Sequence, residues 1–334
     1  MGVGLILTAS HERWPLARPF SIAHGTRTHA DVVLATVTCD GLSGRGEGVP
    51  YPRYGESVPE VIAALNQAGQ AISKDDTAVS LGLKGAAASA LDAALWDLRS
   101  QREGRSINQL CGWPALRPLT TAYTISIGTP AEMRERAREE STRPLLKIKT
   151  GRDQIISCVE AVREGAPDAQ LIVDANESWP ESELADLCRA MHDLGVAMVE
   201  QPLPSGGDEA LGRFEHLVPI FADESFHSAA DIAHCARFYD GVNIKLDKTG
   251  GLTPALQALD AARAAKLRIM CGCMVGTSLA MAPAFLLAQQ AEFTDLDAPL
   301  LLAKDRPGGF RFEGSTMFPL EQPFWGNPHS VPSI

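Results

Sequence analysis

The 334-residue sequence lacks several features that would assign it to a broad functional class. It has no uncharged apolar run of the roughly 18 to 20 residues that a membrane-spanning helix needs. The opening segment GVGLILTA is apolar but short, and it is not followed by the pattern of a signal peptide. Basic residues are not in excess either: the formal net charge of -11 argues against nucleic acid or an anionic membrane as a partner.

Paired cysteines and a phosphate-binding loop are also missing. The seven cysteines are an odd number and form no C-x-x-C, so we expect reduced, mostly buried thiols in a cytoplasmic protein. Cys271 and Cys273 form a C-x-C without further cysteine or histidine ligands nearby, which favours core packing over a metal site. The glycines of segment 41–48 are not part of a G-x-x-x-x-G-K-[ST] motif, so a turn with a short strand is expected there.

The composition, with 45% hydrophobic and 21% charged residues, is that of an ordinary globular protein. Within 1–115, a β-branched segment at 31–39 is followed by two helical patterns at 57–72 and 84–102. Strands followed by helices without alternation predict an α+β capping domain over these residues. The tail at 305–334 is rich in glycine and proline, and we expect it to fold back onto this domain.

Residues 116–304 show a different, alternating pattern. Short apolar runs are separated by helical stretches, and most runs end on a polar or charged residue. There are eight such runs, at 119–127, 145–149, 171–175, 196–200, 219–223, 242–245, 268–272 and 293–297.

The spacing of the charged run ends predicts the architecture. From Lys149 to Asp174 is 25 residues, on to Glu200 26, to Asp223 23 and to Lys245 22. A strand, a loop, a helix and a return loop need about that many residues. Eight such units predict an α/β fold of the (β/α)8-barrel type, with functional groups at the carboxyl ends of the strands. A doubly wound open sheet gives the same alternation, but would not so readily place a charged residue at the end of strand after strand.

Asp174, Glu200 and Asp223 end three consecutive predicted strands, so they should converge on one sector of the barrel mouth. Three carboxylates without cysteine or histidine suit a hard cation, with Mg²⁺ the first choice and Mn²⁺ the alternative. The other interpretation is that each carboxylate caps the helix that follows. A metal-dependent hydrolase normally uses histidine ligands or a paired metal site, and no histidine ends a predicted strand.

Lys149 and Lys245 end the second and sixth strands, which lie on opposite sides of an eight-stranded barrel. The predicted order is therefore base, metal, base. Lys248 competes for the second position, but it falls beyond the apolar strand. A cation and desolvation both lower the pKa of a lysine, so that either amine could act as a base near neutral pH. A metal-stabilised enolate between two opposed bases favours racemisation or epimerisation, whereas elimination or cycloisomerisation needs one base.

The motifs LLKIKTG, LIVDANESW, MVEQPLP, FADES and VNIKLDKTGGLTPAL occur in this order, and together they resemble the enolase superfamily, specifically its muconate-lactonising subgroup. The resemblance covers nearly the whole chain. It implies the lysine bases and the Mg²⁺-stabilised enolate that are established for that superfamily.

Within that subgroup, the segment FTDLDAPLLL is similar to that of the dipeptide epimerases, where its two aspartates bind a free α-ammonium group. By the same resemblance, Arg27 grips a distal substrate carboxylate, which favours glutamate or aspartate as second residue. A loop with Tyr51 and Tyr54 closes over the barrel mouth. The implied substrate contacts are Arg27, Thr124, Lys147, Cys273, Met274, Asp295 and Asp297, and Asn176 and Glu224 are expected to support the metal ligands.

The resemblance thus implies a metal-dependent epimerase whose partner is a small dipeptide. It would invert the α-carbon of the C-terminal residue, as between L-Ala-L-Glu and L-Ala-D-Glu, in the recycling of cell-wall peptides. The alternatives on the same scaffold are a cycloisomerase, an o-succinylbenzoate synthase or an N-acyl amino acid racemase, whose substrates lack a free ammonium. A barrel that kept the fold and lost its chemistry is the non-catalytic alternative. A homo-oligomer is compatible with the sequence.

Overall fold

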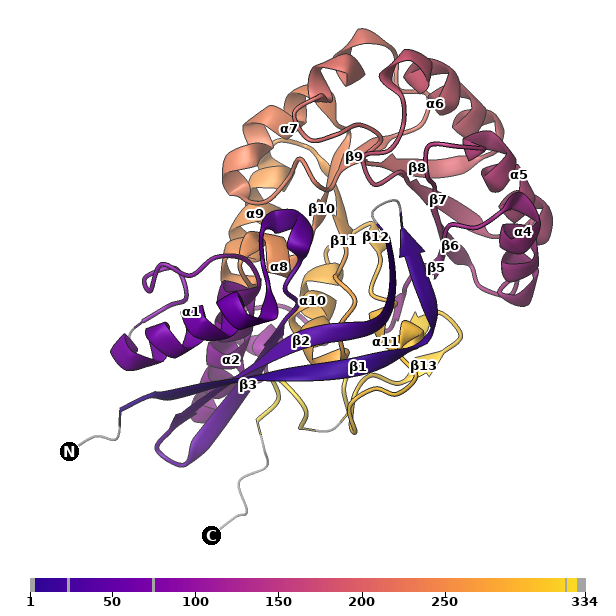
Figure 1. The fold of residues 1–334 in the computed structure, drawn as a ribbon. Coiled ribbons are helices and arrows are strands. Elements are labelled where there is room, and N and C mark those ends of the chain that lie inside the picture. Colours follow the sequence, from indigo (N-terminus) through magenta and orange to yellow (C-terminus); the bar gives the residue numbers. More distant parts are fainter. Residues whose placement is uncertain (1–3, 23–24, 74–75, 322, 329–334) are drawn as a thin grey trace.

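The computed structural model describes residues 4–22, 25–73, 76–321 and 323–328. Its N-terminal part, here called the cap, is a three-stranded antiparallel sheet covered by two helices (Figure 1). The strands are β1 (Ile6–Ile22), β2 (Gly25–Cys39) and β3 (Leu42–Gly48), and the helices are α1 (Val58–Ala71) and α2 (Gly85–Glu103). Both helices predicted for this region are confirmed to within one residue at each end.

The glycine-rich segment 41–48 is a turn and a strand, as expected, and the structure shows why glycine is needed. Gly44, Gly46 and Gly48 face helix α2 so closely that a Cβ atom on any of them would lie 2.1 Å from a carbonyl oxygen of that helix. The facing positions of α2 are mostly alanines, including Ala86, Ala90 and Ala94. Small residues on both sides therefore let strand β3 and α2 pack backbone to backbone.

The second part is a parallel eight-stranded sheet in the order β12-β11-β10-β9-β8-β7-β6-β5, so the barrel prediction is confirmed. The first and last strands meet through a hydrogen bond of 2.8 Å from Ala122 N to Thr294 O, just beside β5. Its strands are β5 (Tyr123–Ile125), β6 (Leu145–Lys149), β7 (Gln170–Asp174), β8 (Val196–Glu200), β9 (Ile220–Ala222), β10 (Gly241–Ile244), β11 (Arg268–Cys271) and β12 (Phe293–Thr294).

Helices cover the outside of the barrel (Figure 1). The remaining helices of the chain are α3 (Ile107–Leu110), α4 (Pro130–Glu139), α5 (Ile155–Gly165), α6 (Leu184–Asp193), α7 (Ile232–Phe238), α8 (Leu246–Thr249), α9 (Leu252–Ala264), α10 (Ser278–Ala288) and α11 (Ala298–Leu301), with 3-10 turns at η1 (Pro52–Tyr54), η2 (Glu181–Glu183), η3 (Asp208–Arg213) and η4 (Ala229–Asp231). No helix among the described residues is both long and apolar enough to cross a membrane.

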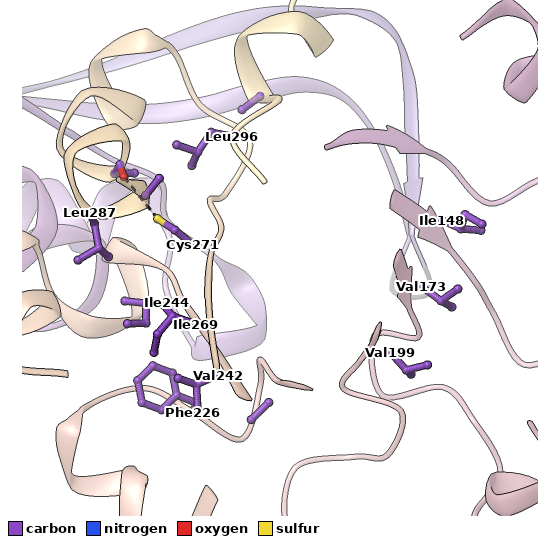
Figure 2. Packing of buried hydrophobic residues seen from close by; sticks show 14 of the residues in the cluster. Ile148, Val173, Val199, Phe226, Val242, Ile244, Ile269, Cys271, Leu287 and Leu296 are labelled. Atoms are coloured by element: carbon purple, nitrogen blue, oxygen red, sulfur yellow. Dashed lines mark hydrogen bonds between the residues drawn. The ribbon is translucent and has the colours of Figure 1, made fainter. Parts of the chain in front are cut away.

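Alternation along the strands separates an outer from an inner surface. Figure 2 shows Ile148, Val173 and Val199 on one side of the barrel and Val242 and Ile244 on the other, pointing away from the interior. Side chains of the opposite parity fill the interior. At the amino-terminal half of the strands these form an apolar cluster, here called the barrel floor, of Ala122, Leu145, Ile172, Met198, Phe221, Met270 and Phe293.

Two predicted strands differ from the structure. The segment predicted as one strand at 119–127 is divided, because β4 (Leu119–Thr120) leaves the barrel and pairs with the tail strand β14 (Thr316–Met317). That strand pairs in turn with β13 (Phe312–Glu313). The run at 293–297 is strand only at β12, and its two aspartates lie in the loop beyond.

The tail contacts the cap as well as the barrel. Arg306 lies 2.7 Å from the buried Glu47 of β3, and Gly326 N donates to Asp97 Oδ1 of α2 at 2.8 Å. These contacts are those expected of a tail that folds back on the cap. The domain limits at residues 115 and 304 stay a prediction.

Candidate active site

A cavity opens at the carboxyl ends of the barrel strands and is walled on one side by the cap. It brings together residues that are far apart in the sequence. All nine residues predicted as bases or substrate contacts line it, namely Arg27, Thr124, Lys147, Lys149, Lys245, Cys273, Met274, Asp295 and Asp297. Asn176, Asp223 and Glu224 line it too, while Asp174 and Glu200 lie fully buried at its base.

The two predicted bases lie at the two ends of the carboxylate group. Lys149, from β6, donates to Asp174 Oδ2 at 2.5 Å, and Lys245, directly after β10, donates to Asp223 Oδ2 at 2.6 Å. Strands β7, β8 and β9 lie between β6 and β10 and supply the three carboxylates. The lysine of β6, the three carboxylates and Lys245 therefore follow one another around the sheet in the order that the spacing predicted.

Lys147 lies at the centre of the charged group. Its Nζ atom is 3.0 Å from Asp174 Oδ2, 2.8 Å from Glu200 Oε2 and 2.7 Å from Asp295 Oδ2. Burial disfavours its charge, but the three carboxylates outweigh burial and hold the pKa of Lys147 well above its ordinary value. Lys147 thus links the carboxylates of strands β7 and β8 to the aspartates that follow β12.

The neighbouring carboxylates set the direction of the pKa shift of Lys245. Burial would lower it, but the Asp223 and Glu200 carboxylates outweigh burial and hold the pKa of Lys245 well above the ordinary value. The lowered lysine pKa predicted from the sequence requires a cation beside the amine, so it stays a prediction.

The carboxylates are too many for the cations around them. Burial and the neighbouring Asp174 raise the pKa of Glu200 to about 6, and burial and Asp223 raise the pKa of Glu224 to about 8. Glu224 Oε2 and Asn176 Oδ1 are buried without a hydrogen-bond partner in the described part of the chain. An excess of buried oxygen ligands fits an additional cation.

The lysines hold the carboxylate oxygens in the present arrangement. Accordingly, no three histidine, cysteine, aspartate or glutamate side chains among the described residues stand in a metal-binding arrangement. The donor set still fits a hard divalent cation, because Asp174, Glu200 and Asp223 are oxygen ligands on adjacent strands at one depth of the barrel.

Asp295 and Asp297 form a second, separate group of negative charge in the cavity. Asp295 Oδ2 accepts from Lys147, whereas its Oδ1 atom is buried and has no hydrogen-bond partner among the described residues. Asp297 Oδ2 accepts from the backbone N–H of Thr124 at 2.8 Å. Burial and the neighbouring Asp295 raise the pKa of Asp297 to about 7. This end of the cavity therefore favours a ligand that brings a positive charge.

Arg27 supplies the opposite charge from the cap. It lies on β2 directly across from Phe20 of β1, and both side chains reach the cavity. Its guanidinium carbon is 4.9 Å from the centre of the Tyr51 ring. Within the described residues no carboxylate lies within 4.0 Å of it, which leaves this cation available to an anionic ligand group.

Three further residues orient the carboxylates, and sequence reasoning considered only one of them, Lys248, as a competing base. Lys248, on α8, donates to Asp223 Oδ1 at 2.5 Å and does not line the cavity, so it is not placed as a base. Asn243 donates to Glu200 Oε1 at 2.7 Å, and Gln201 Oε1 accepts from Asp223 N at 2.9 Å. Period-two alternation from Lys245 could have identified Asn243, whereas nothing in the sequence signalled the role of Gln201.

The two cysteines of the C-x-C segment lie on opposite surfaces. Cys271 points outward (Figure 2) and donates to Ala284 O at 3.4 Å. Cys273, in contrast, lines the cavity. No disulfide bond joins any two of the seven cysteines, all of which lie in the described part of the chain.

Two curated proteins are similar to this chain over most of its length. The L-Ala-D/L-Glu epimerase of Escherichia coli (strain K12) is 44% identical over 306 residues, which are 90% of this chain and 95% of that protein. The N-acetyl-D-glutamate racemase of a Pseudoalteromonas species is 41% identical over 304 residues, which are 90% and 96% of the two chains.

Solved structures share the fold. A crystal structure of an enolase family member from Agrobacterium tumefaciens with homology to dipeptide epimerases, with bound sodium and L-Ala-L-Glu, superposes with a TM-score of 0.93. It is 46% identical, and the match covers 96% of this chain and all of that one. A dipeptide epimerase from Enterococcus faecalis V583, complexed with Mg and L-Leu-L-Tyr, superposes with a TM-score of 0.88 at 28% identity, covering 95% and 97% of the two chains.

Two family models match the chain. The N-terminal domain of the mandelate racemase/muconate lactonizing enzymes matches residues 6–112, and the enolase C-terminal domain-like model matches residues 131–323. Because these two models together account for both the cap and the barrel, the chain belongs to the mandelate racemase/muconate lactonizing enzyme family of the enolase superfamily.

Proposed function

We propose that this protein is an isomerase, specifically a divalent-metal-dependent dipeptide epimerase. It inverts the α-carbon of the C-terminal residue of a dipeptide such as L-Ala-L-Glu. The observation that carries the proposal is the buried, unpartnered Oδ1 of Asp295 in the same cavity as the two lysines. A free α-ammonium would satisfy that oxygen, and dipeptides have this group where N-acyl amino acids do not.

Asp174, Glu200 and Asp223 would hold the metal, with Mg²⁺ the first choice and Mn²⁺ the alternative. Asn176 and Glu224 would support them, because their oxygens line the same part of the cavity. When bound, the cation would supply Lewis acidity that lowers the free energy of forming an enolate next to the substrate carboxylate. The protein contributes the buried, oxygen-only ligands that keep this charge close to the reacting carbon.

Lys149 and Lys245 would transfer the protons. Their ammonium groups start from opposite sides of the carboxylate group, so the α-carbon of a ligand between them meets one amine on each face. One lysine, as a neutral amine, takes the α-proton from one face and becomes an ammonium, while the other, as an ammonium, gives a proton to the opposite face and becomes neutral. The configuration at the α-carbon is inverted because one proton leaves from one face and another arrives on the opposite face.

The remaining lining residues would orient the dipeptide. Asp295 and Asp297 bind its ammonium group. The guanidinium of Arg27, which has no carboxylate partner among the described residues, binds an acidic side chain of its second residue. Lys147 lies between the metal ligands and Asp295, where its positive charge would attract a substrate oxygen. Thr124, Cys273 and Met274 complete the wall.

A second candidate is racemisation of an N-acyl amino acid, because one relative of similar identity is an N-acetyl-D-glutamate racemase. The same lysines would serve that reaction. The two functions differ in what faces Asp295 and Asp297: an N-acyl group brings no charge to this acidic end. The dipeptide is therefore favoured.

We further propose that the protein acts in the cytoplasm, in the recycling of cell-wall peptides. The absence of a disulfide bond among the seven cysteines, all of them described, supports a reducing compartment. The preference of Arg27 for an acidic residue supports dipeptides that end in glutamate.

The test is proton exchange in D2O. L-Ala-L-Glu should exchange the α-proton of glutamate while L-Ala-D-Glu forms, and N-acetyl-L-glutamate should react at least about 100-fold more slowly. EDTA should stop the reaction, and added Mg²⁺ should restore it. Faster turnover of N-acetylglutamate would favour the second candidate, and full activity in EDTA would contradict the metal assignment.

A further inference from the structure

Residues 49–56, here called the tyrosine loop, connect β3 to α1 and bring Tyr51 and Tyr54 into the cavity wall. Their two rings contact each other, with centres 5.4 Å apart. Both tyrosines are half-buried, so their position depends on what fixes the loop.

Glu56 fixes the loop to the cap. Its carboxylate accepts from Tyr51 N at 3.0 Å and from Ala86 N, at the start of α2, at 2.9 Å. The loop is tied to the barrel as well, since Val49 N donates to Asp247 Oδ1 of α8 at 3.0 Å.

The strongest tie to the barrel is a two-bond ion pair between Arg53 and Glu177. Arg53 Nε and Nη2 donate to Glu177 Oε2 and Oε1 at 2.9 and 2.8 Å. Glu177 lies in the turn after β7, where its own φ of 66° and the φ of 44° at Asn176 bend the chain sharply. Its side chain is buried, and Oε1 also accepts from Ser205 N at 2.8 Å. A buried carboxylate held on two sides is a rigid anchor for the half-exposed arginine.

Tyr51 in turn supports Arg27. The guanidinium of Arg27 lies over the ring at 4.9 Å, and no carboxylate among the described residues competes for it. Because β1 and β2 reach the barrel as a long two-stranded arm (Figure 1), the direction of Arg27 depends on what it contacts there. The aromatic face of Tyr51 is that contact.

We propose that Arg53, Glu177 and Tyr51 act as positioning residues that set selectivity for an acidic side chain. Glu177 anchors Arg53, Arg53 fixes the tyrosine loop, and Tyr51 directs the guanidinium of Arg27 toward the substrate's side-chain carboxylate. The inference rests on the proposed epimerase function, and it extends it by assigning selectivity to a contact between cap and barrel. Breaking the ion pair should change which dipeptide is preferred. Neither Arg53 nor Glu177 is among the residues around the cavity, so this change would act through the tyrosine loop.

The experiment compares L-Ala-L-Glu with L-Ala-L-Gln, which has the same shape without the charge, by α-proton exchange in D2O. Tyr51→Leu should lower the ratio of the two kcat/KM values about fivefold, the size expected for one cation–π contact. Tyr51→Phe keeps the ring and should keep the ratio. Arg53→Met should lower the ratio in the same direction, through a higher KM for L-Ala-L-Glu, and Arg53→Lys should recover part of it.

The matched control is Arg213→Met. Arg213 lies 2.8 Å from Glu181, which belongs to the same segment after β7 as Glu177, but both side chains are exposed and neither residue belongs to the cap. Loss of this pair should leave the ratio unchanged. Hydrogen exchange of residues 49–56 should rise in Arg53→Met and not in the control.

The outcomes separate the two proposals. Exchange of neither dipeptide by the wild-type protein would overturn the proposed function and this inference with it. Wild-type exchange combined with an unchanged ratio in folded Tyr51→Leu or Arg53→Met would overturn the inference alone. An equal loss for both dipeptides would also overturn it, because a purely structural role predicts that result.

Discussion

The inner surface of the barrel changes from apolar to charged between two consecutive inward-facing positions of the strands. Along β6, β7, β8 and β9 the floor residue and the next inward residue are Leu145 and Lys147, Ile172 and Asp174, Met198 and Glu200, and Phe221 and Asp223. The amino-terminal half of the interior is therefore dry and apolar, and the carboxyl-terminal half contains the charges.

This difference explains how the charged group can do chemistry. The floor excludes water from below, so the lysines and carboxylates interact through a medium of low polarity, where charges act strongly on each other. Gly241 shows how closely the floor is filled, since a Cβ there would lie 2.5 Å from the Phe221 ring. Changes at the upper end should therefore alter reactivity, and changes at the lower end should alter stability alone.

The largest effect is expected from the two lysines. Lys149→Ala and Lys245→Ala should each slow interconversion of L-Ala-L-Glu and L-Ala-D-Glu by about 10³-fold or more, because each amine is needed once per inversion. Each variant should still exchange the α-proton of one diastereomer, the one whose proton faces the remaining lysine. NMR in D2O with each pure diastereomer measures both.

Lys248→Met is the informative comparison for the lysines. Its amine contacts Asp223 from outside the cavity, so this variant should lose exchange of both diastereomers to a similar extent, if at all. Selective loss of one diastereomer in Lys248→Met, with Lys245→Ala unaffected, would show that the base was wrongly chosen.

A smaller effect is expected from Asp295→Asn, at the acidic end of the cavity. The substitution keeps the shape but removes the charge that faces an ammonium group. The ratio of kcat/KM for L-Ala-L-Glu over N-acetyl-L-glutamate should fall about 100-fold. The N-acetyl substrate is the internal control, because general damage to the site would slow both reactions equally and leave the ratio as it was.

The sequence predicted the regular part of this molecule well. Strands β6 and β8 have the predicted limits, and the charged run ends lie together because a β/α unit has a nearly fixed length. The same regularity explains the error at 119–127. Nothing in a local apolar pattern indicates that Leu119 and Thr120 pair with Met317 and Thr316 almost 200 residues later.

The cap residues that reach the cavity, and the contacts that hold them, could not be predicted from periodicity. The position of Arg27 came from family resemblance alone, because β1 and β2 near the barrel alternate between exposed and half-buried residues and have no apolar face of their own. The ion pair between Arg53 and Glu177 joins a loop to a turn, and neither element has a repeating pattern. Selectivity therefore depends on the part of the structure that sequence reasoning describes least.

The smallest effect is expected at the lower end of the barrel, from His216. Its Nδ1 lies 2.8 Å from Asp240 Oδ2, and Asp240 precedes β10. The hydrogen bond to Asp240 raises the pKa of His216 above its ordinary value. A raised histidine pKa contributes stability that is complete below the unfolded-state pKa of about 6.5 and is lost as pH rises through the folded-state value.

His216→Gln should therefore destabilise the protein by about 1 kcal/mol near pH 6, and by less near pH 8.5. Urea unfolding of both proteins at the two pH values measures this difference. Epimerisation at 25 °C should not change, because the pair lies at the end of the strands opposite the cavity. A stability difference that is the same at both pH values would mean that the ring contributes only as a neutral hydrogen-bonding group. A loss of activity in the folded variant would contradict the assignment of stability alone to the lower end of the barrel.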